Sequence, residues 1–184
     1  RDKLVTGVQT CALPILPTGQ TVIRNGAFTM QDARKEFASF WGVVRRGEKP
    51  TAKIVDTADG RKAVKMEPGG QIYQHFSLLQ PGVEPKGYEI NGEILASGKG
   101  QLLFYIQTFI DEKDARGKFQ RTKVERAPVR FEFQLSEKPQ NFRFSFDLIP
   151  KEQCYIYLRA DDAVIYNVCT SASLKNEEKH GKVQ

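Results

Sequence analysis

The sequence predicts an all-β fold, an antiparallel β-sandwich of the jelly-roll type, and three observations lead to it. Apolar and polar residues alternate strictly over 129–135 and again over 142–148, which is the period of a half-buried antiparallel strand. The 12 Phe and 6 Tyr favour strands, and the 15 Gly and 9 Pro supply turns. Strands do not alternate with helical segments, so many short strands separated by turns predict a sandwich.

Composition narrows the class of partner. A chain of 184 residues, 40% hydrophobic and 27% charged, can form one globular domain with its own core. No apolar run approaches the roughly 18 residues of a membrane-spanning helix, so we expect no membrane partner. The net charge of +6 is spread along the chain and favours solubility. The alternating strands turn their aromatic residues to the core and no RNA-binding motif is present, so we expect no nucleic-acid partner.

The other strands follow from short apolar runs and the turns between them. Asp59-Gly60 predicts a hairpin turn, Leu79–Gly82 predicts a second turn, and Lys138-Pro139 connects the two alternating strands. Further strands are expected at 53–56, 62–67, 71–79, 87–96, 102–110, 153–159 and 163–171.

One segment has helical spacing. Within Met30–Phe40, the apolar residues Ala33, Phe37 and Phe40 fall on one face of a helix. The segment is short, and an extended loop is its alternative.

Both ends of the chain differ from the middle. Residues 1–15 show no strand or helix period, and 5–15 resembles the translation of a sequencing adapter, as found at the edges of reading frames in assembled metagenomes. The remnant of a signal peptide is the alternative. Residues 173–184 are polar and unpatterned. We therefore expect a non-native or disordered leader at 1–15, one folded module at 16–172 and a tail or linker at 173–184.

The cysteines suggest one disulfide. If Asp161 and Asp162 form the loop of a final hairpin, Cys154 lies directly opposite Cys169. Opposed Cα atoms in such a ladder are roughly 4.5–5.5 Å apart, which a disulfide can span. Two reduced thiols are the alternative. A disulfide would imply an oxidising compartment, so we expect a secreted or periplasmic protein.

The sequence offers little catalytic chemistry. No motif of a hydrolase nucleophile, zinc protease, phosphate loop or dinucleotide site is present. His75 is the one histidine of the expected folded part, and we interpret it as a packed or rim residue of a strand. Glu89 and Glu93 would lie roughly 13 Å apart along one strand, too far for a glycosidase pair, although carboxylates from different strands stay open. We expect no enzyme and no catalytic residue.

One sheet face is expected to be polar. If the apolar residues of the strands fill the core, Tyr105, Gln107 and Gln134 turn outward, and we expect Glu93 and Arg143 beside them. Amides and charged groups hydrogen-bond to sugar hydroxyls, and an aromatic ring covers the apolar face of a pyranose. An ordinary solvated face is the alternative.

A series of short motifs occurs in a fixed order along the chain. They are Asn25–Phe28, Trp41-Gly42, Asp59–Lys65, Gln71–Gln74, Leu79–Gly82 and Ala163–Val168. Their order and spacing over residues 22–172 resemble carbohydrate-binding modules of families four and nine, and more loosely the galactose-binding-like jelly rolls.

The resemblance implies a non-catalytic, monomeric module that binds a polysaccharide or oligosaccharide. It also implies a larger secreted polysaccharide-active parent, such as a glycoside hydrolase or lyase. Trp41, Tyr73 or Tyr105 would stack on the sugar. Family members hold a structural calcium through two carboxylates, and this chain has Thr29 and Asn167 there. We therefore expect no metal and no cofactor, although a calcium held by Asn167 and backbone carbonyls stays open.

The alternative function is that of a structural or adhesion module. A structural or adhesion jelly roll would bind a protein partner and would leave the polar face to solvent.

Overall fold

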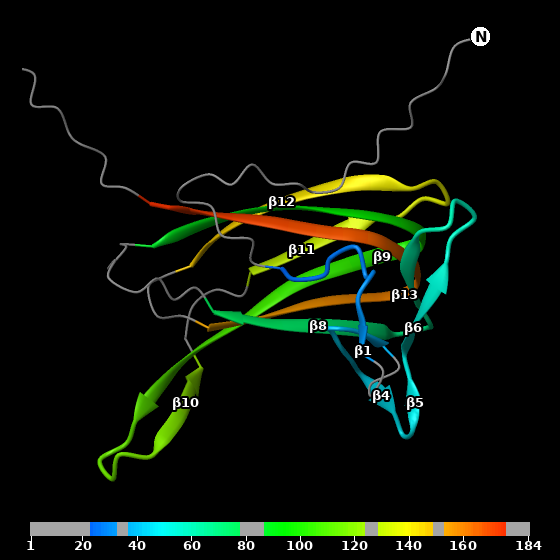
Figure 1. Cartoon of the computed structure of the whole chain (residues 1–184). Helices are drawn as coiled ribbons and strands as arrows, with labels where there is room; N and C mark the ends of the chain where they lie inside the picture. Colours follow the sequence, from blue (N-terminus) through cyan, green and yellow to red (C-terminus); the bar gives the residue numbers. More distant parts are fainter. Residues whose placement is uncertain (1–22, 33–36, 78–86, 124–128, 149–152, 176–184) are drawn as a thin grey trace, which may run out of the picture.

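The computed structural model describes residues 23–32, 37–77, 87–123, 129–148 and 153–175 (Figure 1). In these ranges every regular element is a strand. No membrane-spanning helix is found among the described residues. The strands are β1 (Gln31–Asp32), β2 (Phe37–Ala38), β3 (Gly42–Val43), β4 (Arg45–Arg46), β5 (Lys49–Pro50), β6 (Ala52–Asp56), β7 (Lys62–Met66), β8 (Gly70–Ser77), β9 (Tyr88–Lys113), β10 (Phe119–Lys123), β11 (Val129–Gln134), β12 (Gln140–Leu148) and β13 (Gln153–Leu174).

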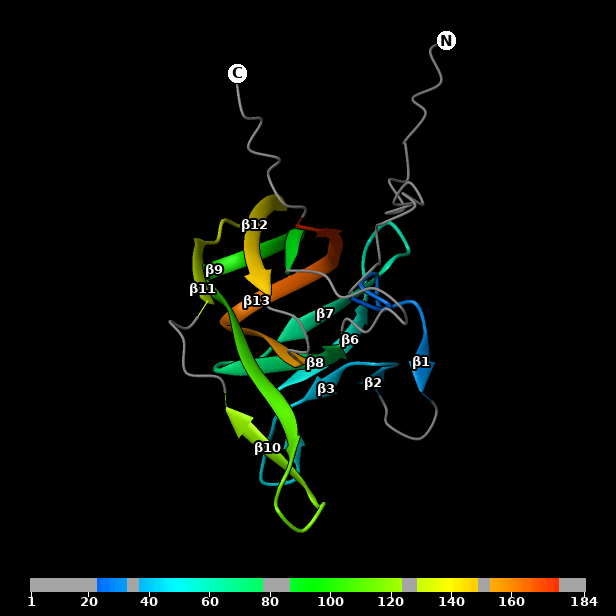
Figure 2. The same ribbon diagram turned by 90° about the vertical axis from the view of Figure 1, so that its left-hand side faces the viewer.

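Two long bent strands organise the fold. β9 and β13 pair antiparallel from Tyr88 opposite Leu174 to Phe109 opposite Gln153, with register shifts near Asp162 and Asn167. Each strand passes from one layer of the sandwich to the other, so hydrogen bonds join both layers into a single nine-stranded sheet that folds over on itself (Figure 2). The predicted antiparallel β-sandwich is confirmed.

We call the two layers of the sandwich the platform sheet and the cover sheet. The platform sheet consists of β3, β8, residues 153–160 of β13, residues 101–113 of β9, β10 and β11. The cover sheet consists of β6, β7, residues 163–174 of β13, residues 88–96 of β9, and β12. The bend of β9 between them contains Gly98 and Gly100, both with positive φ, and a side chain on Gly98 would collide with the backbone of Asp162.

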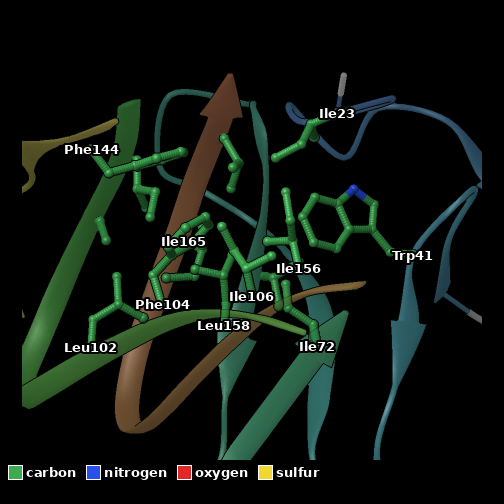
Figure 3. Close-up of a cluster of buried hydrophobic side chains, with 14 of the residues drawn as sticks. Ile23, Trp41, Ile72, Leu102, Phe104, Ile106, Phe144, Ile156, Leu158 and Ile165 are labelled. Atoms are coloured by element: carbon green, nitrogen blue, oxygen red, sulfur yellow. The ribbon is translucent and has the colours of Figure 1, made fainter. Parts of the chain in front are cut away.

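The core lies between the two sheets. Phe104 of the platform sheet stacks on Phe144 of the cover sheet with ring centroids 4.2 Å apart. Isoleucine and leucine side chains of both layers surround this pair, and Trp41 closes one end (Figure 3). The alternation predicted for 142–148 is confirmed, since Phe144, Phe146 and Leu148 are buried. The Phe residues of β11 are only half-buried, because β11 lies at an edge.

The segment with helical spacing is not helical in its described residues, 30–32 and 37–40. Gln31 pairs with Ala38 and Asp32 pairs with Phe37, so β1 and β2 form a short antiparallel ladder. Phe37 and Ala38 are adjacent in sequence and both are buried, whereas Phe40 is 49% exposed with φ +70°. The helical prediction is therefore wrong for the described residues of this segment, because β1 and β2 pair with each other as strands, and Ala33 lies outside the described residues.

The final hairpin is also corrected. β13 runs without a turn through Asp161 and Asp162, which lie at its bend between the two sheets. Cys154 and Cys169 therefore stand 15 residues apart on one strand, Cys154 beside Thr108 and Cys169 beside Glu93. They are not joined by a disulfide. Two adjacent aspartates predict a turn because turns are exposed to solvent. Here the aspartates are exposed because β13 crosses the edge of the sandwich at this point.

Several turns agree with the sequence. Asp59-Gly60 closes the β6–β7 hairpin, with φ +77° at Gly60. Lys138-Pro139 lies between β11 and β12, whereas Leu79–Gly82 lies outside the described residues. β13 continues past the expected boundary at residue 172 to Leu174. The β4–β5 and β9–β10 hairpins both project from the platform sheet on the side away from β12 (Figure 1 and Figure 2).

Candidate functional site

Six aromatic rings gather on the outer side of the platform sheet. We call this cluster the aromatic face: Tyr73 and His75 of β8, Tyr155 and Tyr157 of β13, and Tyr105 and Phe109 of β9. The register explains the clustering. Tyr157 lies directly between Tyr73 and Tyr105, and Tyr155 lies directly between His75 and Gln107. Because successive side chains point to opposite sides of a sheet, these rows share the side opposite the core.

The rings contact one another across three strands. Tyr105 and Tyr157 are stacked nearly parallel, with centroids 4.7 Å apart and planes 8° apart. Tyr73 follows at 5.8 Å from Tyr157. Tyr155 holds the second row, at 5.0 Å from His75 and 5.5 Å from Phe109. The result is one continuous aromatic surface.

The rings differ in exposure. The four tyrosines are half-buried and His75 is exposed, whereas Phe109 is only 4% exposed beneath its neighbours. A soluble domain keeps large rings at its surface at a cost in exposed apolar area, so a continuous cluster of this kind indicates a contact surface.

Amide side chains hydrogen-bond to the polar atoms of the rings. Gln71 Nε2 donates to Tyr105 Oη at 2.9 Å, and Tyr157 Oη donates to Gln107 Oε1 at 3.3 Å. His75 Nε2 lies 3.1 Å from Gln153 Oε1. Within the described part of the chain, the side-chain Oε1 of Gln71 and the side-chain Nε2 of Gln107 have no further partner, so both can bind a ligand.

Burial makes two of the phenols harder to ionise. Burial raises the pKa of Tyr105 above 10.0, and the Gln71 hydrogen bond and the Arg159 charge offset part of that effect. Burial also raises the pKa of Tyr157, and the neighbouring tyrosines add to the shift. Both hydroxyls therefore remain hydrogen-bond donors and acceptors at neutral pH.

Three of the predicted ligand residues lie together. Tyr73, Tyr105 and Gln107 are all on the aromatic face. Gln134 is on the same side of the platform sheet but at its far end, opposite Gln101, where its Nε2 donates to the Gly100 carbonyl at 2.9 Å.

The other three predicted residues lie elsewhere. Trp41 belongs to the core: it is 3% exposed, its Nε1 donates to the Asn25 carbonyl, and its ring lies 5.5 Å from Phe28. Its prediction as a stacking residue is therefore wrong. Glu93 and Arg143 are paired with each other at 2.7 Å on the outer side of the cover sheet. They cannot share a face with Tyr105, because β9 bends between residues 93 and 105.

Glu93 and Arg143 line a separate shallow hollow of about 360 Å³. Its other walls are Asn91, Gly92, Phe144, Cys169, Thr170 and Ser171. No aromatic ring stands exposed among these described residues, since Phe144 is 5% exposed. The hollow therefore lacks the stacking surface that the aromatic face offers.

Sequence reasoning missed Gln71, Tyr155 and Tyr157 as site residues. The signal was present as aromatic residues at even spacing on three strands: two apart at 73 with 75 and at 155 with 157, and four apart at 105 with 109. What could not be read was the register that brings these strands side by side.

Metal ligands are not concentrated in the described part of the chain. No group of three or more His, Cys, Asp or Glu side chains there could hold an ion.

Comparison with known proteins gives the fold a context. No protein-family model matches the chain, and no curated protein matches it. A similar solved structure is the enzymatically active domain of tailspike protein 4 of bacteriophage CBA120, with 13% identity and a TM-score of 0.52. The match covers 84% of this chain and 21% of the tailspike chain, so this chain spans about a fifth of its length. This similarity shows a shared fold.

Carbohydrate-binding modules are also among the similar solved structures. TmCBM61, solved in complex with β-1,4-galactotriose, is 12% identical with a TM-score of 0.45, and the match covers 84% of this chain and 94% of that one. The CBM22-1 xylan-binding domain of Paenibacillus barcinonensis Xyn10C is 12% identical with a TM-score of 0.44, over 86% and 98% of the two chains. A family four module, one of the two families that the sequence motifs resemble, is a further match.

Proposed function

We propose that the chain is a non-catalytic module that binds glycan on the aromatic face. The observation that carries the proposal is the gathering of six rings on the outer side of a sheet, with four half-buried tyrosines among them. Apolar area that remains at a surface and is surrounded by polar groups marks a place where a ligand binds.

The chemistry of the aromatic face suits a sugar. A pyranose has an apolar C–H face and a rim of hydroxyls. Tyr73, Tyr105 and Tyr157 supply ring area for the apolar face, and Gln71 and Gln107 supply planar amides for the hydroxyls. Since one side of the Tyr105 ring is covered by Tyr157, the sugar would contact the opposite side of Tyr105 and the exposed edges of the row.

The length of the row favours an oligosaccharide over a single sugar. Tyr73, Tyr157, Tyr105 and Arg130 stand opposite one another on four adjacent strands. Three inter-strand steps of ~4.8 Å give a row of about 14 Å. A glycan laid along it would contact several side chains in turn, so we propose binding to internal segments of a polysaccharide.

The absence of a catalytic role is part of the proposal. On the outer side of the platform sheet, the carboxylate of Glu132 is held by Arg130 at 2.6 Å. Glycosidases ordinarily need two facing carboxylates, and Glu132 faces an arginine instead. The module would act by holding a larger secreted polysaccharide-active protein on its substrate.

Affinity electrophoresis of the full chain in gels that contain a panel of soluble polysaccharides tests the proposal. We expect at least one polysaccharide to slow the chain, and Tyr157→Ala to abolish that retardation, because Tyr157 contacts both Tyr73 and Tyr105.

Tyr166→Ala is the matched control. Tyr166 is a half-buried tyrosine of the same strand, but it lies beyond the bend and its hydroxyl is 3.1 Å from Ser97. It should leave retardation unchanged. If no polysaccharide slows the wild-type chain, the glycan-binding proposal is overturned and the structural or adhesion module with a protein partner takes its place.

A further inference from the structure

Basic side chains gather at one end of the aromatic face. Arg159 follows Tyr157 by two residues on the same side of β13, between Gln71 and Leu103, and it is exposed. Its charge acts on the Tyr105 hydroxyl and lowers the pKa of that phenol against the effect of burial. The guanidinium therefore lies close to the tyrosine row.

The β4–β5 hairpin brings more positive charge to the same end. Val44 N donates to the Gln71 carbonyl, and Gln71 N donates to Thr51 Oγ1, so the base of the hairpin is fixed beside Gln71. The hairpin then projects from the platform sheet on the side away from β12 and the cover sheet (Figure 1), and the outer side of the platform sheet carries the aromatic face. Its residues Arg45, Arg46 and Lys49 are exposed.

Arg46 ties the hairpin to the end of β8. A side chain on Gly69 would run into the Arg46 guanidinium, so this group lies directly over Gly69. Gly69 immediately precedes β8, and Gly70 stands opposite Ala160, next to Arg159. Arg46 and Arg159 therefore both lie at the end of the platform sheet where β8 begins.

This positive charge is not neutralised within the described part of the chain. Arg45, Arg46, Lys49 and Arg159 form no ion pair there, whereas Arg130 is paired with Glu132. Among the nearby carboxylates, Glu48 lies in the β4–β5 turn, Asp161 Oδ1 accepts from Gly69 N at 2.8 Å, and Glu67 is paired with Lys53 at 3.3 Å. None of them forms an ion pair with the four cations within the described residues.

We infer that the ligand is an anionic polysaccharide, whose carboxylate or sulfate groups are bound by Arg159 and the β4–β5 hairpin while its rings lie on the aromatic face. This inference rests on the proposed glycan binding and names the class of glycan. Arginine suits the role because its planar fork donates two parallel hydrogen bonds to a carboxylate or sulfate. A neutral glycan would leave these cations unused.

The test compares polymers that differ only in charge. Affinity electrophoresis of the full chain is run with polygalacturonate and its methyl ester, and with dextran sulfate and dextran. We expect at least one anionic polymer to bind the chain about tenfold more tightly than its neutral partner, and added salt to weaken the difference. The polymer that binds identifies carboxylate or sulfate as the preferred group.

Matched variants separate a site from simple ion exchange by a cationic protein. Arg159→Gln removes one positive charge beside the aromatic face, and Lys65→Gln removes one exposed positive charge from β7 of the cover sheet. We expect Arg159→Gln to weaken binding to the anionic polymer about tenfold, and Lys65→Gln to leave it nearly unchanged. Equal losses in the two variants would overturn the inference.

The remaining outcomes are also decisive. Retardation by the neutral polymers as strong as by the anionic ones would overturn the inference and leave the proposed glycan binding standing. No retardation by any polysaccharide would overturn both. Arg159-dependent binding of a single-stranded oligothymidylate, without binding of polysaccharide, would assign the aromatic face to nucleic acid and would also overturn both.

Discussion

The ring of Tyr73 occupies the space above Gly42 that a side chain at position 42 would need. Gly42 pairs with Tyr73 across β3 and β8, and three ring carbons of Tyr73 stand where a β-carbon would begin. The glycine thus sets the position of the first ring in the row. The adjacent residues Trp41 and Gly42 have different roles. Trp41 fills part of the core, and Gly42 leaves space for the Tyr73 ring on the outer side of the platform sheet.

Gly42→Ala is therefore expected to weaken glycan binding by displacing Tyr73. The backbone at Gly42 does not have a positive φ, so alanine is tolerated there and the collision with the ring is the main cost, about 1–3 kcal/mol of unfolding free energy. We expect affinity to fall about tenfold in affinity electrophoresis. In a Tyr73→Ala background the same substitution should have no further effect on binding. An equal loss in both backgrounds would mean that Gly42 acts through something other than this ring.

Adjacent residues of β9 should separate binding from stability. Tyr105 is on the aromatic face and Phe104 is fully buried against Phe144. Tyr105→Ala should reduce glycan affinity by about 1–2 kcal/mol, near tenfold, with a small change in stability. Phe104→Ala should cost roughly 3–5 kcal/mol of unfolding free energy. Urea unfolding and affinity electrophoresis measure the two effects, and the reverse pattern would mean that the two sides of the platform sheet have been exchanged.

Phe133 is a weaker stability probe than the alternation suggests. It faces Phe142 at 4.9 Å but is half-buried at the edge strand β11. Its replacement by alanine should cost less than that of Phe104, since the edge is already partly open to water.

Much of the fold could be predicted from the sequence because period-two alternation is a local property. Together with the turn signals it identified most of the longer strands, although not β1–β5 or β10, and it placed Tyr105 and Gln107 on the outer side of their strand. It could not reveal that β13 continues through Asp161-Asp162, because a polar pair is equally suited to a turn and to a bend at the sandwich edge. The sequence therefore predicts the site only in part, because the row of Tyr73, Tyr157 and Tyr105 depends on pairing between strands that are distant in the sequence.

The corrected path of β13 changes the expectation for the cysteines. Because Cys154 and Cys169 belong to different layers, reducing agent should not lower the thermal midpoint of the folded chain. In a Cys11→Ser variant, thiol titration after unfolding without reductant should find both remaining cysteines reactive. A midpoint that falls by several degrees with reductant, together with loss of both thiols, would restore the disulfide.

Alkaline pH should destabilise the chain through the phenols of the aromatic face. Burial raises the pKa of Tyr105 and Tyr157 in the folded state, whereas unfolded tyrosine titrates near 10. A group whose pKa is raised by folding holds its proton more tightly in the folded state. Its contribution is complete below pH 10, and it is lost as the pH rises from there through the raised folded value.

Urea unfolding measured from neutral to strongly alkaline pH tests this expectation. The free energy of unfolding should be insensitive to these groups at neutral pH and should fall above about pH 10. Tyr105→Phe combined with Tyr157→Phe keeps both rings but removes both hydroxyls, so the alkaline fall should become shallower. It should not vanish, because burial also raises the pKa of Tyr88 in the core. An unchanged fall in the double variant would show that the hydroxyls of the aromatic face do not resist ionisation, and that the row is more open to water than its stacking indicates.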